Sequence, residues 1–309
     1  MPSYAFFDGK FMPLSEAKIG IVTHAFNYGT ACFEGIRGNW NEEQGQMHIF
    51  RLREHYDRLL ESCHVLQIEI PHTMDKLIAL TIELVQRCGY REDTYIRPLA
   101  YKSSEQVGVR LHNLEASFLI FAMPFGPYLD IDKGAKCCIS SWQRVDNDMI
   151  PIRAKINGLY VNSALAKTEA VEKGFDEAIL LTHHGHVSEG SGENIFLLID
   201  GQLVTPPASD NILIGITRDT VMKLAKNELG IETIERSIDP GELYTAEECF
   251  LTGTAAHVTP VIEIDHRKVG RGAVGGITKK LQALYFDVIL GKNKRYLDWC
   301  TPAYKLVKV

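Results

Sequence analysis

The chain has 309 residues, of which 45% are hydrophobic and 23% are charged, and its formal net charge is −6 at pH 7. This composition is typical of a globular protein with a sizeable core, and at roughly 100–200 residues per domain the length suggests two domains. The acidic balance argues against nucleic acid or an anionic membrane as the main partner and favours small molecules.

The first 123 residues carry the signals of a hairpin, two helices and two strands. Asp8 and Gly9 lie between apolar runs in "YAFFDGKF" and predict a tight hairpin turn. Apolar residues recur at three- and four-residue steps from about Glu54 and again over 74–88, which predicts two helices, the second ending at Gly89. Strands are predicted at "TYIRPLAY" and "ASFLIFAM", whereas the glycine-punctuated "FNYGTACFEGIRGNW" is assigned to no element.

The segment 124–134 is the predicted domain boundary, because its two prolines and two glycines interrupt any periodic pattern. It would separate a small N-terminal domain, 1–123, from a larger C-terminal domain, 135–309. In the larger domain we predict a strand at "AKCCISSW", a helix over about 159–173, hairpins at "EAILLTHHGHVSEG" and "ENIFLLIDGQLV", a helix at "TRDTVMKLAKNEL", a strand at "ECFLTG" and a last helix at "TKKLQALYFDVIL". Hairpins mixed with helices favour an α+β fold.

The cysteines and the N-terminal stretch bear on the compartment. Seven scattered cysteines without a C-x-x-C pair indicate neither a disulfide framework nor a structural zinc site, and reduced thiols in a cytoplasmic protein fit best. "MPSYAFFDGKFMPL" has no basic region followed by an apolar run, and no apolar run reaches the roughly 18 residues of a membrane span. We therefore expect a protein that is neither exported nor bound to a membrane.

Two motifs are weak on their own. "GRGAVG", Gly270 to Gly275, matches the dinucleotide fingerprint, but that fingerprint needs a βαβ unit and an acidic residue about 20 positions on, so a flexible loop is preferred. "HHGH" falls around a hairpin turn, where neighbouring side chains point to opposite faces, so solvated turn residues are preferred over a metal site.

Three features together indicate a phosphate-bearing cofactor. "GITRD" at a helix start and the small-residue turn "TGTAA" after a strand could each bind an anion through backbone N–H groups. Arg58 would add a permanent cation, although it could also be a solvated residue on its helix.

A lysine and an acid complete the set of groups that a pyridoxal phosphate enzyme needs. Lys155 interrupts the apolar and small residues of "MIPIRAKINGLYVNS", and "SEGSGENIF" carries Glu189 and Glu193. The alternative is a structural lysine with glutamates that cap the backbone. Lys167 is the rival lysine, but it lies within a continuous helical pattern and is expected at the surface.

The sequence resembles the branched-chain amino acid aminotransferases, of the fold-type IV pyridoxal phosphate superfamily, over nearly the whole chain. The matching stretches occur in the family order: "HAFNYGTACFEGIRG", "FRLREHYDRLLES", "YIRPL", "RAKINGLYVNS", "SEGSGENIF", "IGITRD" and "TGTAAHVTPV". The resemblance implies the two-domain fold of D-amino acid aminotransferase, with a pyridoxal 5′-phosphate-binding domain at 135–309. It also implies at least a homodimer, in which a small-domain loop of the neighbour completes the active site.

The resemblance assigns a role to individual residues. Lys155 would be the Schiff-base lysine, Glu189 the partner of the pyridine nitrogen, and Tyr160 a donor to the ring hydroxyl. The cofactor phosphate would be held by Arg58, the backbone of Ile216 and Thr217, and Thr254. The substrate would be held by Tyr95, Thr254 and Ala255 at its α-carboxylate, by Tyr28, Phe33 and Tyr128 at its side chain, and by Arg97 at the distal carboxylate of glutamate.

The resemblance further implies transamination of leucine, isoleucine and valine with 2-oxoglutarate, without a metal. Arg110, in "SSEQVGVRLHN", lies in a loop near which the superfamily varies its substrate choice, so a D-amino acid or (R)-amine aminotransferase is one alternative. An aminodeoxychorismate lyase of the same fold is another, and a non-enzymatic dinucleotide or phosphate binder is the alternative from another class.

Overall fold

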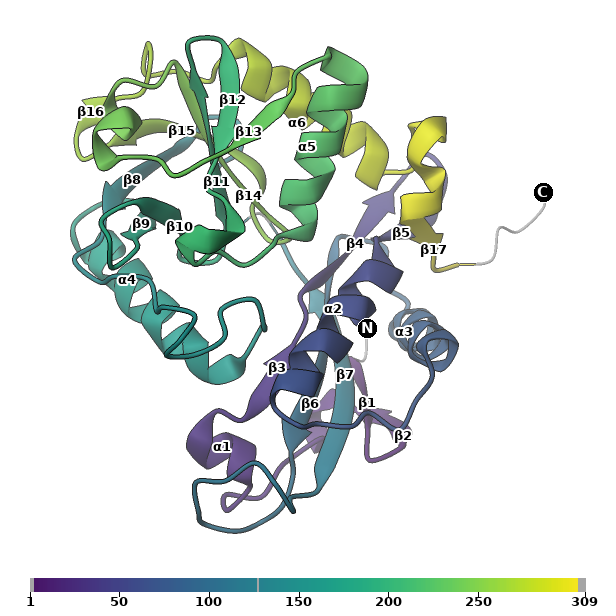
Figure 1. The fold of residues 1–309 in the computed structure, drawn as a ribbon. Coiled ribbons are helices and arrows are strands. Elements are labelled where there is room, and N and C mark those ends of the chain that lie inside the picture. Colours follow the sequence, from purple (N-terminus) through teal and green to yellow (C-terminus); the bar gives the residue numbers. More distant parts are fainter. Residues whose placement is uncertain (1–2, 127, 305–309) are drawn as a thin grey trace. The chain divides into compact units, whose positions relative to one another are not determined.

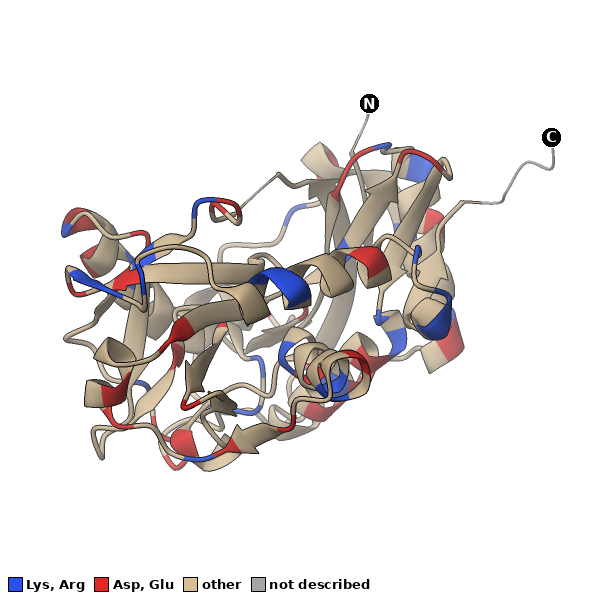
Figure 2. Ribbon diagram, turned by 90° about the horizontal axis from the view of Figure 1, so that it is seen from above, with Lys and Arg blue, Asp and Glu red and all other residues tan. Residues whose placement is uncertain are grey.

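The structure, a computed structural model, describes residues 3–126 and 128–304 (Figure 1). Acidic and basic residues are interspersed along the chain (Figure 2). Within the described ranges, every helix is too short or too polar to cross a membrane. All seven cysteines are buried and free of disulfide bonds.

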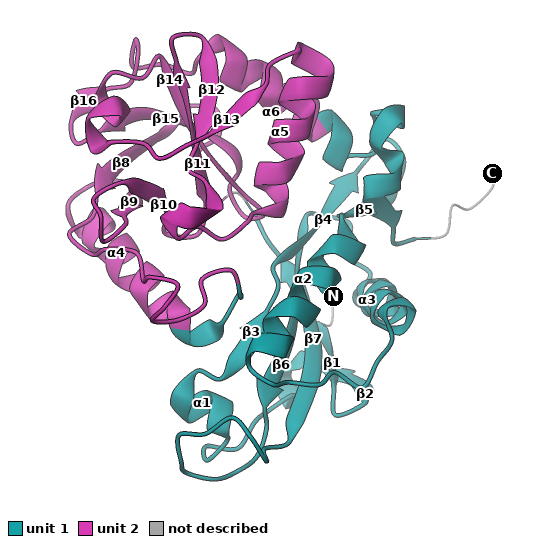
Figure 3. Ribbon diagram, viewed as in Figure 1, with its two compact units in different colours: residues 1–126, 154–158, 287–309 teal, residues 127–153, 159–286 magenta. Residues whose placement is uncertain are grey.

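The chain divides into two compact units (Figure 3). Unit 1 comprises the described residues of Met1–Gly126, Ala154–Gly158 and Asp287–Val309, and unit 2 comprises those of Pro127–Arg153 and Leu159–Phe286. The break after Gly126 falls inside the expected linker. The units are nevertheless discontinuous in sequence, in contrast to the contiguous ranges 1–123 and 135–309, because 154–158 and the described residues 287–304 contact the N-terminal part of the chain.

Unit 1 is built on an antiparallel sheet with the strand order β17-β5-β4-β6-β7-β1-β2 among the described residues, and β3 pairs with β6 beside this path. The strands are β1 (Tyr4–Phe7), β2 (Lys10–Pro13), β3 (Ala31–Phe33), β4 (Ile36–Asn41), β5 (Gln46–Phe50), β6 (Thr94–Lys102), β7 (Ala116–Pro124) and β17 (Cys300–Pro302). The helices are α1 (His24–Tyr28), α2 (Leu52–Val65) and α3 (Met74–Cys88), with short 3-10 helices η1 (Leu14–Glu16) and η5 (Lys294–Trp299). Helix α2 contacts β3, and α3 contacts β1 and β7.

The predicted elements of unit 1 are largely confirmed. Strands β1 and β2 pair across Asp8 and Gly9, both of which have positive φ, and α3 ends at Gly89 in the left-handed conformation. Helix α2 begins at Leu52, earlier than the predicted Glu54, because Arg51 takes the cap position.

Strands β3, β4 and β5 were not predicted, since glycines interrupt this part of the sequence. Two of them, Gly35 and Gly38, accommodate neighbouring side chains instead of forming turns. A Cβ atom on Gly35 would lie 2.7 Å from the Tyr95 hydroxyl, and one on Gly38 would lie 2.6 Å from the Met47 sulfur. Glycine here therefore marks a close approach within a sheet.

Unit 2 is built on a mixed sheet with the strand order β10-β9-β8-β15-β14-β11-β12-β13 among the described residues, and β16 pairs with β15. The strands are β8 (Ala135–Ile139), β9 (Glu177–Leu181), β10 (Val187–Gly190), β11 (Asn194–Ile199), β12 (Gln202–Thr205), β13 (Thr233–Glu235), β14 (Glu248–Gly253), β15 (His257–Ile264) and β16 (Arg267–Lys268). The helices are α4 (Tyr160–Glu172), α5 (Ile216–Leu229) and α6 (Gly276–Ile289), with 3-10 helices η2 (Asn157–Leu159), η3 (Ala208–Asp210) and η4 (Pro240–Tyr244). The helix predicted over 159–173 and both predicted hairpins are confirmed.

The sheet of unit 2 has apolar residues on both faces. Along β8, Cys137 belongs to one buried cluster, whereas its neighbour Cys138 belongs to another. The second cluster includes Ala166 and Ala170 of α4, so this helix covers one face of the sheet. Two sheets with hairpins and flanking helices confirm the predicted α+β class.

Candidate active site

Lys155 is held by its backbone on two sides in unit 1. Its N–H donates to the Ser62 hydroxyl at 3.0 Å, and its carbonyl accepts from the N–H of Phe33 at 3.1 Å. The Ser62 hydroxyl in turn donates to the carbonyl of Arg58 at 2.9 Å. Lys155 is therefore fixed between α2 and β3, and its Nζ lies 5.1 Å from the centre of the Phe33 ring.

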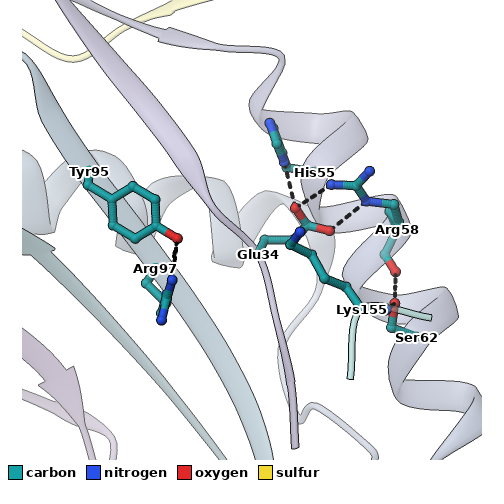
Figure 4. Close-up of polar contacts among 7 residues, drawn as sticks. All are labelled: Glu34, His55, Arg58, Ser62, Tyr95, Arg97 and Lys155. Carbon is teal, nitrogen blue, oxygen red and sulfur yellow. Dashed lines mark hydrogen bonds and ion pairs between the residues drawn. The ribbon is translucent and has the colours of Figure 1, made fainter. Parts of the chain in front are cut away.

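Arg58 is part of a buried ion-pair cluster that also contains Glu34 and His55 (Figure 4). Nε and Nη2 of Arg58 donate to the two carboxylate oxygens of Glu34 at 2.7 and 2.8 Å, and Nδ1 of His55 lies 2.7 Å from Oε2. Arg58 is thus not the solvated helix residue that the sequence left open. Glu34 and His55 have no predicted role, because neither spacing nor periodicity in the sequence relates the residue after β3 to helix α2.

The pKa values of this cluster fix its charges. Burial raises the pKa of Glu34, but the charge and hydrogen bonds of Arg58 and the hydrogen bond of His55 outweigh it, so the net pKa lies well below the usual range. Burial lowers the pKa of His55, and the nearby charges of Arg58 and Lys155 lower it further. The hydrogen bond and charge of Glu34 raise this pKa but do not outweigh the other effects. At neutral pH His55 is therefore a neutral donor to an ionised Glu34, which also binds Arg58.

Tyr95 and Arg97 (Figure 4) form a second cluster in the same unit together with Phe33. Arg97 donates from Nε and Nη2 to the Tyr95 hydroxyl at 3.1 and 2.6 Å, and its Cζ lies 4.4 Å from the centre of the Phe33 ring. Because Phe33 also contacts Lys155, the structure brings together five of the predicted residues of unit 1. They are Phe33, Arg58, Tyr95, Arg97 and Lys155.

Tyr28 has other surroundings in unit 1. Its hydroxyl accepts a hydrogen bond from the N–H of Gly108 at 3.1 Å, and its ring lies 4.7 Å from that of His24. These contacts connect it to the loop between β6 and β7, on which Arg110 is exposed. The assignments of Tyr28 to a substrate pocket and of Arg110 to substrate choice stay predictions.

Glu189, the predicted partner of the pyridine nitrogen, lies in unit 2 among groups that stabilise a negative charge. Its carboxylate forms an ion pair with Arg144 at 2.8 Å and accepts hydrogen bonds from Nδ2 of Asn194 at 3.0 Å and from the N–H of Leu213 at 3.1 Å. Arg144 also lies 3.3 Å from the Ser163 hydroxyl of α4. Sequence analysis missed Arg144 and Asn194, since no motif spacing relates Arg144 to Glu189.

The rival acid, Glu193, has a different environment. It is buried, and its Oε2 accepts from the N–H of Gly192 at 3.0 Å. Burial and the nearby charge of Glu177 raise the pKa of Glu193 to about 8, so it holds a proton at neutral pH. Lys167, the rival lysine that was expected at the surface, is partly exposed and forms an ion pair with the buried Glu177 at 2.7 Å.

The predicted anion-binding segments lie in unit 2. Helix α5 begins at Ile216, Thr217 is buried, and the cap residue Gly215 supplies no side-chain hydrogen bond to the helix. A Cβ atom at Gly215 would lie 2.1 Å from Oδ1 of Asn194, so glycine lets the helix start approach the partner of Glu189. The remaining predicted residues of this unit are Tyr128 after the break, Tyr160 at the start of α4, and Thr254 and Ala255 in the turn between β14 and β15.

The two weak motifs have structural explanations. "GRGAVG" precedes α6, and the Glu248 carboxylate accepts from the N–H groups of Ile277 and Thr278 at 3.0 and 2.8 Å. The first turn of this helix is thus capped by the protein itself. In "HHGH", the rings of His183 and His184 contact each other, and within 3–126 and 128–304 no cluster of three or more possible metal ligands is found.

Comparison with known proteins identifies the family. Residues 31–264 match the amino-transferase class IV family. A probable branched-chain-amino-acid aminotransferase of Aquifex aeolicus is 51% identical, over 97% of each chain. The branched-chain aminotransferase of Thermoproteus uzoniensis, solved with norvaline, has a TM-score of 0.94 and 45% identity, over 98% of this chain and 100% of that one. The branched-chain amino acid aminotransferase of Thermobaculum terrenum, solved in its PLP-bound holo-form, has a TM-score of 0.93 and 38% identity, over 98% of this chain and 99% of that one.

These similarities extend over nearly the full length of the chain and confirm the fold-type IV prediction. The chain therefore belongs to the amino-transferase class IV family, as the resemblance of its motifs to branched-chain amino acid aminotransferases predicted.

Proposed function

We propose that the protein is a pyridoxal 5′-phosphate-dependent aminotransferase that moves the amino group of leucine, isoleucine or valine to 2-oxoglutarate, giving branched 2-oxo acids and L-glutamate. The observation that carries this proposal is Lys155, fixed through Ser62 and Phe33 beside the Arg58 ion-pair cluster. The relatives named above support the substrate class, since they are branched-chain aminotransferases of nearly the same length.

The donor set of the chain fits this cofactor. Lys155 offers an amine for the aldehyde, and Arg58 offers a cation for the phosphate, together with the start of α5 at Thr217. Glu189 offers an anion for the pyridine nitrogen, Tyr160 a hydroxyl for the ring oxygen, and Thr254 with Ile216 further phosphate donors. When bound, pyridoxal phosphate supplies a ring that withdraws electrons from the α-carbon of the substrate.

The residues of the chain have distinct tasks in this scheme. Lys155 takes the α-proton at Nζ and returns it, and the hydrogen bonds to its backbone keep Nζ in place. Glu189 stays anionic because Arg144, Asn194 and the N–H of Leu213 all stabilise its charge. Glu34 fixes the guanidinium of Arg58 in one orientation through two hydrogen bonds.

Substrate recognition divides between a constant and a variable part. Tyr95, Thr254 and Ala255 would bind the α-carboxylate that all substrates share, and Phe33, Tyr28 and Tyr128 would line the side-chain pocket. Arg97 would bind the distal carboxylate of glutamate. Its contacts with Tyr95 and Phe33 give it partners when an aliphatic side chain enters, which avoids a buried charge without a partner.

We further propose that the enzyme is cytoplasmic and works as a homodimer or larger oligomer. The buried, free cysteines support a reducing compartment. Exposed apolar residues on α1 and on the loop between β6 and β7 support an interface, since Phe26 is 66%, Val107 81% and Val109 87% exposed in the single chain.

The cofactor assignment is tested by colour and by chemistry. The purified protein should absorb visible light, borohydride should bleach it, and peptide mapping should find the reduced cofactor on Lys155. Lys155→Ala should abolish transamination of leucine and leave the far-ultraviolet circular dichroism unchanged. A colourless protein that retains a nicotinamide, label on Lys167, or faster turnover of D-leucine than of L-leucine would each contradict the proposal.

A further inference from the structure

The Lys167 side chain of α4 is partly buried against β9. Its side chain is 26% exposed, and its Nζ donates to the backbone carbonyl of Asp176 and to Oε2 of Glu177, at 2.7 Å from the latter. The side chain of Glu177 is fully buried. These two acceptors fix the ammonium group in one position.

An ammonium group has three N–H bonds, and the third partner of Lys167 is Tyr128. Nζ lies 5.1 Å from the centre of the Tyr128 ring, within the range of a cation–π contact. Tyr128 is 41% exposed, and the covered part of its ring includes the contact with the Lys167 ammonium group. The orientation of Tyr128 therefore depends on Lys167.

The charges of the cluster keep Lys167 cationic. Burial lowers the pKa of Lys167, but the charge and hydrogen bond of Glu177 raise it more, and Tyr128 and Glu193 act in the same direction. Glu193 retains its proton at neutral pH, so one cation faces one anion in the cluster. Lys167 is thus a cation at neutral pH, as the cation–π contact with Tyr128 requires.

We propose that Lys167 is a positioning residue for substrate binding, which holds the Tyr128 ring in the orientation that contacts the branched side chain of the substrate. The inference rests on the proposed function, because that proposal assigns Tyr128 to the side-chain pocket. Lys167 itself touches neither substrate nor cofactor in this scheme. Its effect should therefore fall on the KM for the amino acid and much less on kcat.

The test removes Lys167 without leaving a lone buried charge. Lys167→Met alone would leave Glu177 buried without its cation, so the variant used is Lys167→Met with Glu177→Gln. In the holoenzyme we expect the KM for leucine to rise about threefold to tenfold, with kcat changed less than about twofold, the scale of one cation–π contact. The dissociation constant of 4-methylpentanoate, a leucine analogue without the amino group, should rise by the same factor.

Three further variants identify the pathway of the effect. Lys167→Arg keeps the cation and should retain a KM close to that of the wild type. Lys173→Met removes another lysine near the end of α4, whose partner is Glu169 at 2.6 Å, and should change nothing. In a Tyr128→Ala background, which itself raises the KM, the Lys167 and Glu177 substitutions should have no additional effect.

The outcomes separate this inference from the proposed function. If Tyr128→Ala leaves the KM unchanged, or if the effects of the Tyr128 and Lys167 substitutions add, Lys167 does not act through Tyr128 and the inference is overturned. The proposed function survives that result as long as the wild type transaminates leucine and Lys155→Ala does not. A holoenzyme without leucine transaminase activity would overturn both.

Discussion

Glu189 of β10 and Glu193, just before β11, differ in what surrounds their carboxyl groups. Glu189 faces the Arg144 guanidinium and two N–H donors, all of which stabilise a negative charge. Glu193 lies near Glu177 and is buried, and its pKa of about 8 keeps it protonated at neutral pH. The sequence "SEGSGENIF" could not separate these acids, because the difference arises from residues far away along the chain.

This contrast predicts different results for the same substitution. Glu189→Gln should leave the cofactor bound but slow transamination at least about 100-fold, because an amide cannot keep the pyridine nitrogen protonated. Glu193→Gln replaces a neutral acid with a neutral amide of the same shape and should retain activity within about threefold at pH 7. Single-turnover kinetics of the two variants decide the matter, and the opposite pattern would make Glu193 the partner of the nitrogen.

Arg97 is the residue that we propose lets one site accept both leucine and glutamate. Arg97→Met should weaken the half-reaction with 2-oxoglutarate by about 2–5 kcal/mol of transition-state stabilisation, the scale for removing one partner of a buried charge pair. The leucine half-reaction should change much less, since Arg97 then contacts only Tyr95 and Phe33. Following each half-reaction separately by cofactor absorbance measures the difference. Equal losses in both, or a 2-oxoglutarate defect in Arg110→Met instead, would contradict the assignment.

At the scale of elements, the cluster of Glu34, His55 and Arg58 connects helix α2 to the residue that follows β3. This cluster should make the free energy of unfolding depend on pH. The pKa of His55 is lowered in the folded chain, so below the unfolded value of roughly 6.5 the unfolded chain binds a proton that the folded chain does not. Acidification from pH 7.5 to 5.5 therefore destabilises the fold, by about 1.4 kcal/mol for one histidine that stays neutral. The pKa of Glu34 is also lowered, so its contribution to the free energy of unfolding is present throughout this window. That contribution is lost only as the pH falls below the unfolded pKa of about 4.3.

Urea unfolding at fixed protein concentration tests this expectation. His55→Asn keeps a donor for Glu34 but does not titrate, so its stability should fall less than that of the wild type between pH 7.5 and 5.5. His48 is also buried with a lowered pKa and adds to the wild-type slope, so the comparison uses the difference between variants. His64→Asn, on the exposed side of α2, is the control and should keep the wild-type slope. Equal slopes for the wild type and His55→Asn would mean that His55 is charged in the folded chain.

The elements themselves were predictable where local signals determine them. The hairpin at Asp8 and Gly9, helix α3 and the start of α5 follow from turn residues, apolar period and capping, which are local. Strands β3 to β5 could not be predicted, because glycines in this region resemble turn signals. Gly35 and Gly38 are instead required by the close approach of the Tyr95 and Met47 side chains, which lie far away or on another strand. The candidate site shows the same limit. Lys155, Arg58 and Glu189 could be assigned from their motifs, whereas the ion pairs of Glu34 and His55, which lie in quoted motifs too, and that of Arg144 are identified only by distance.

At the scale of the whole molecule, the chain returns to unit 1 twice after leaving it. Residues 154–158, with Lys155 among them, contact β3 and α2, although the rest of their neighbourhood in sequence belongs to unit 2. A boundary read from composition cannot reveal such a return, because it shows only where the chain leaves a domain. Lys155, the proposed Schiff-base lysine, is thereby attached to the unit that carries Arg58, Tyr95 and Arg97.

The exposed apolar side chains of unit 1 allow a test of the proposed oligomer. Two hydrogen bonds connect the loop between β6 and β7 to α1. The N–H of Gly108 donates to the Tyr28 hydroxyl, and the Gly108 carbonyl lies within hydrogen-bond distance of Nε2 of His24. Val107 and Val109 flank Gly108, so their loop is held in place. Burying them against a second chain would remove apolar surface from water, and two lysines there would instead place charges in the interface.

Val107→Lys with Val109→Lys should therefore shift the sedimentation coefficient from that of a dimer or larger oligomer towards that of a 34.7 kDa monomer, with unchanged circular dichroism. Val65→Lys, at the end of α2, is the matched control, since Val65 is also exposed but lies on another element. If the neighbour's loop completes the active site, transaminase activity should fall together with the oligomer. A double variant that sediments as the wild type does would place the interface elsewhere, and a wild type that is monomeric at micromolar concentration would rule out the proposed oligomer.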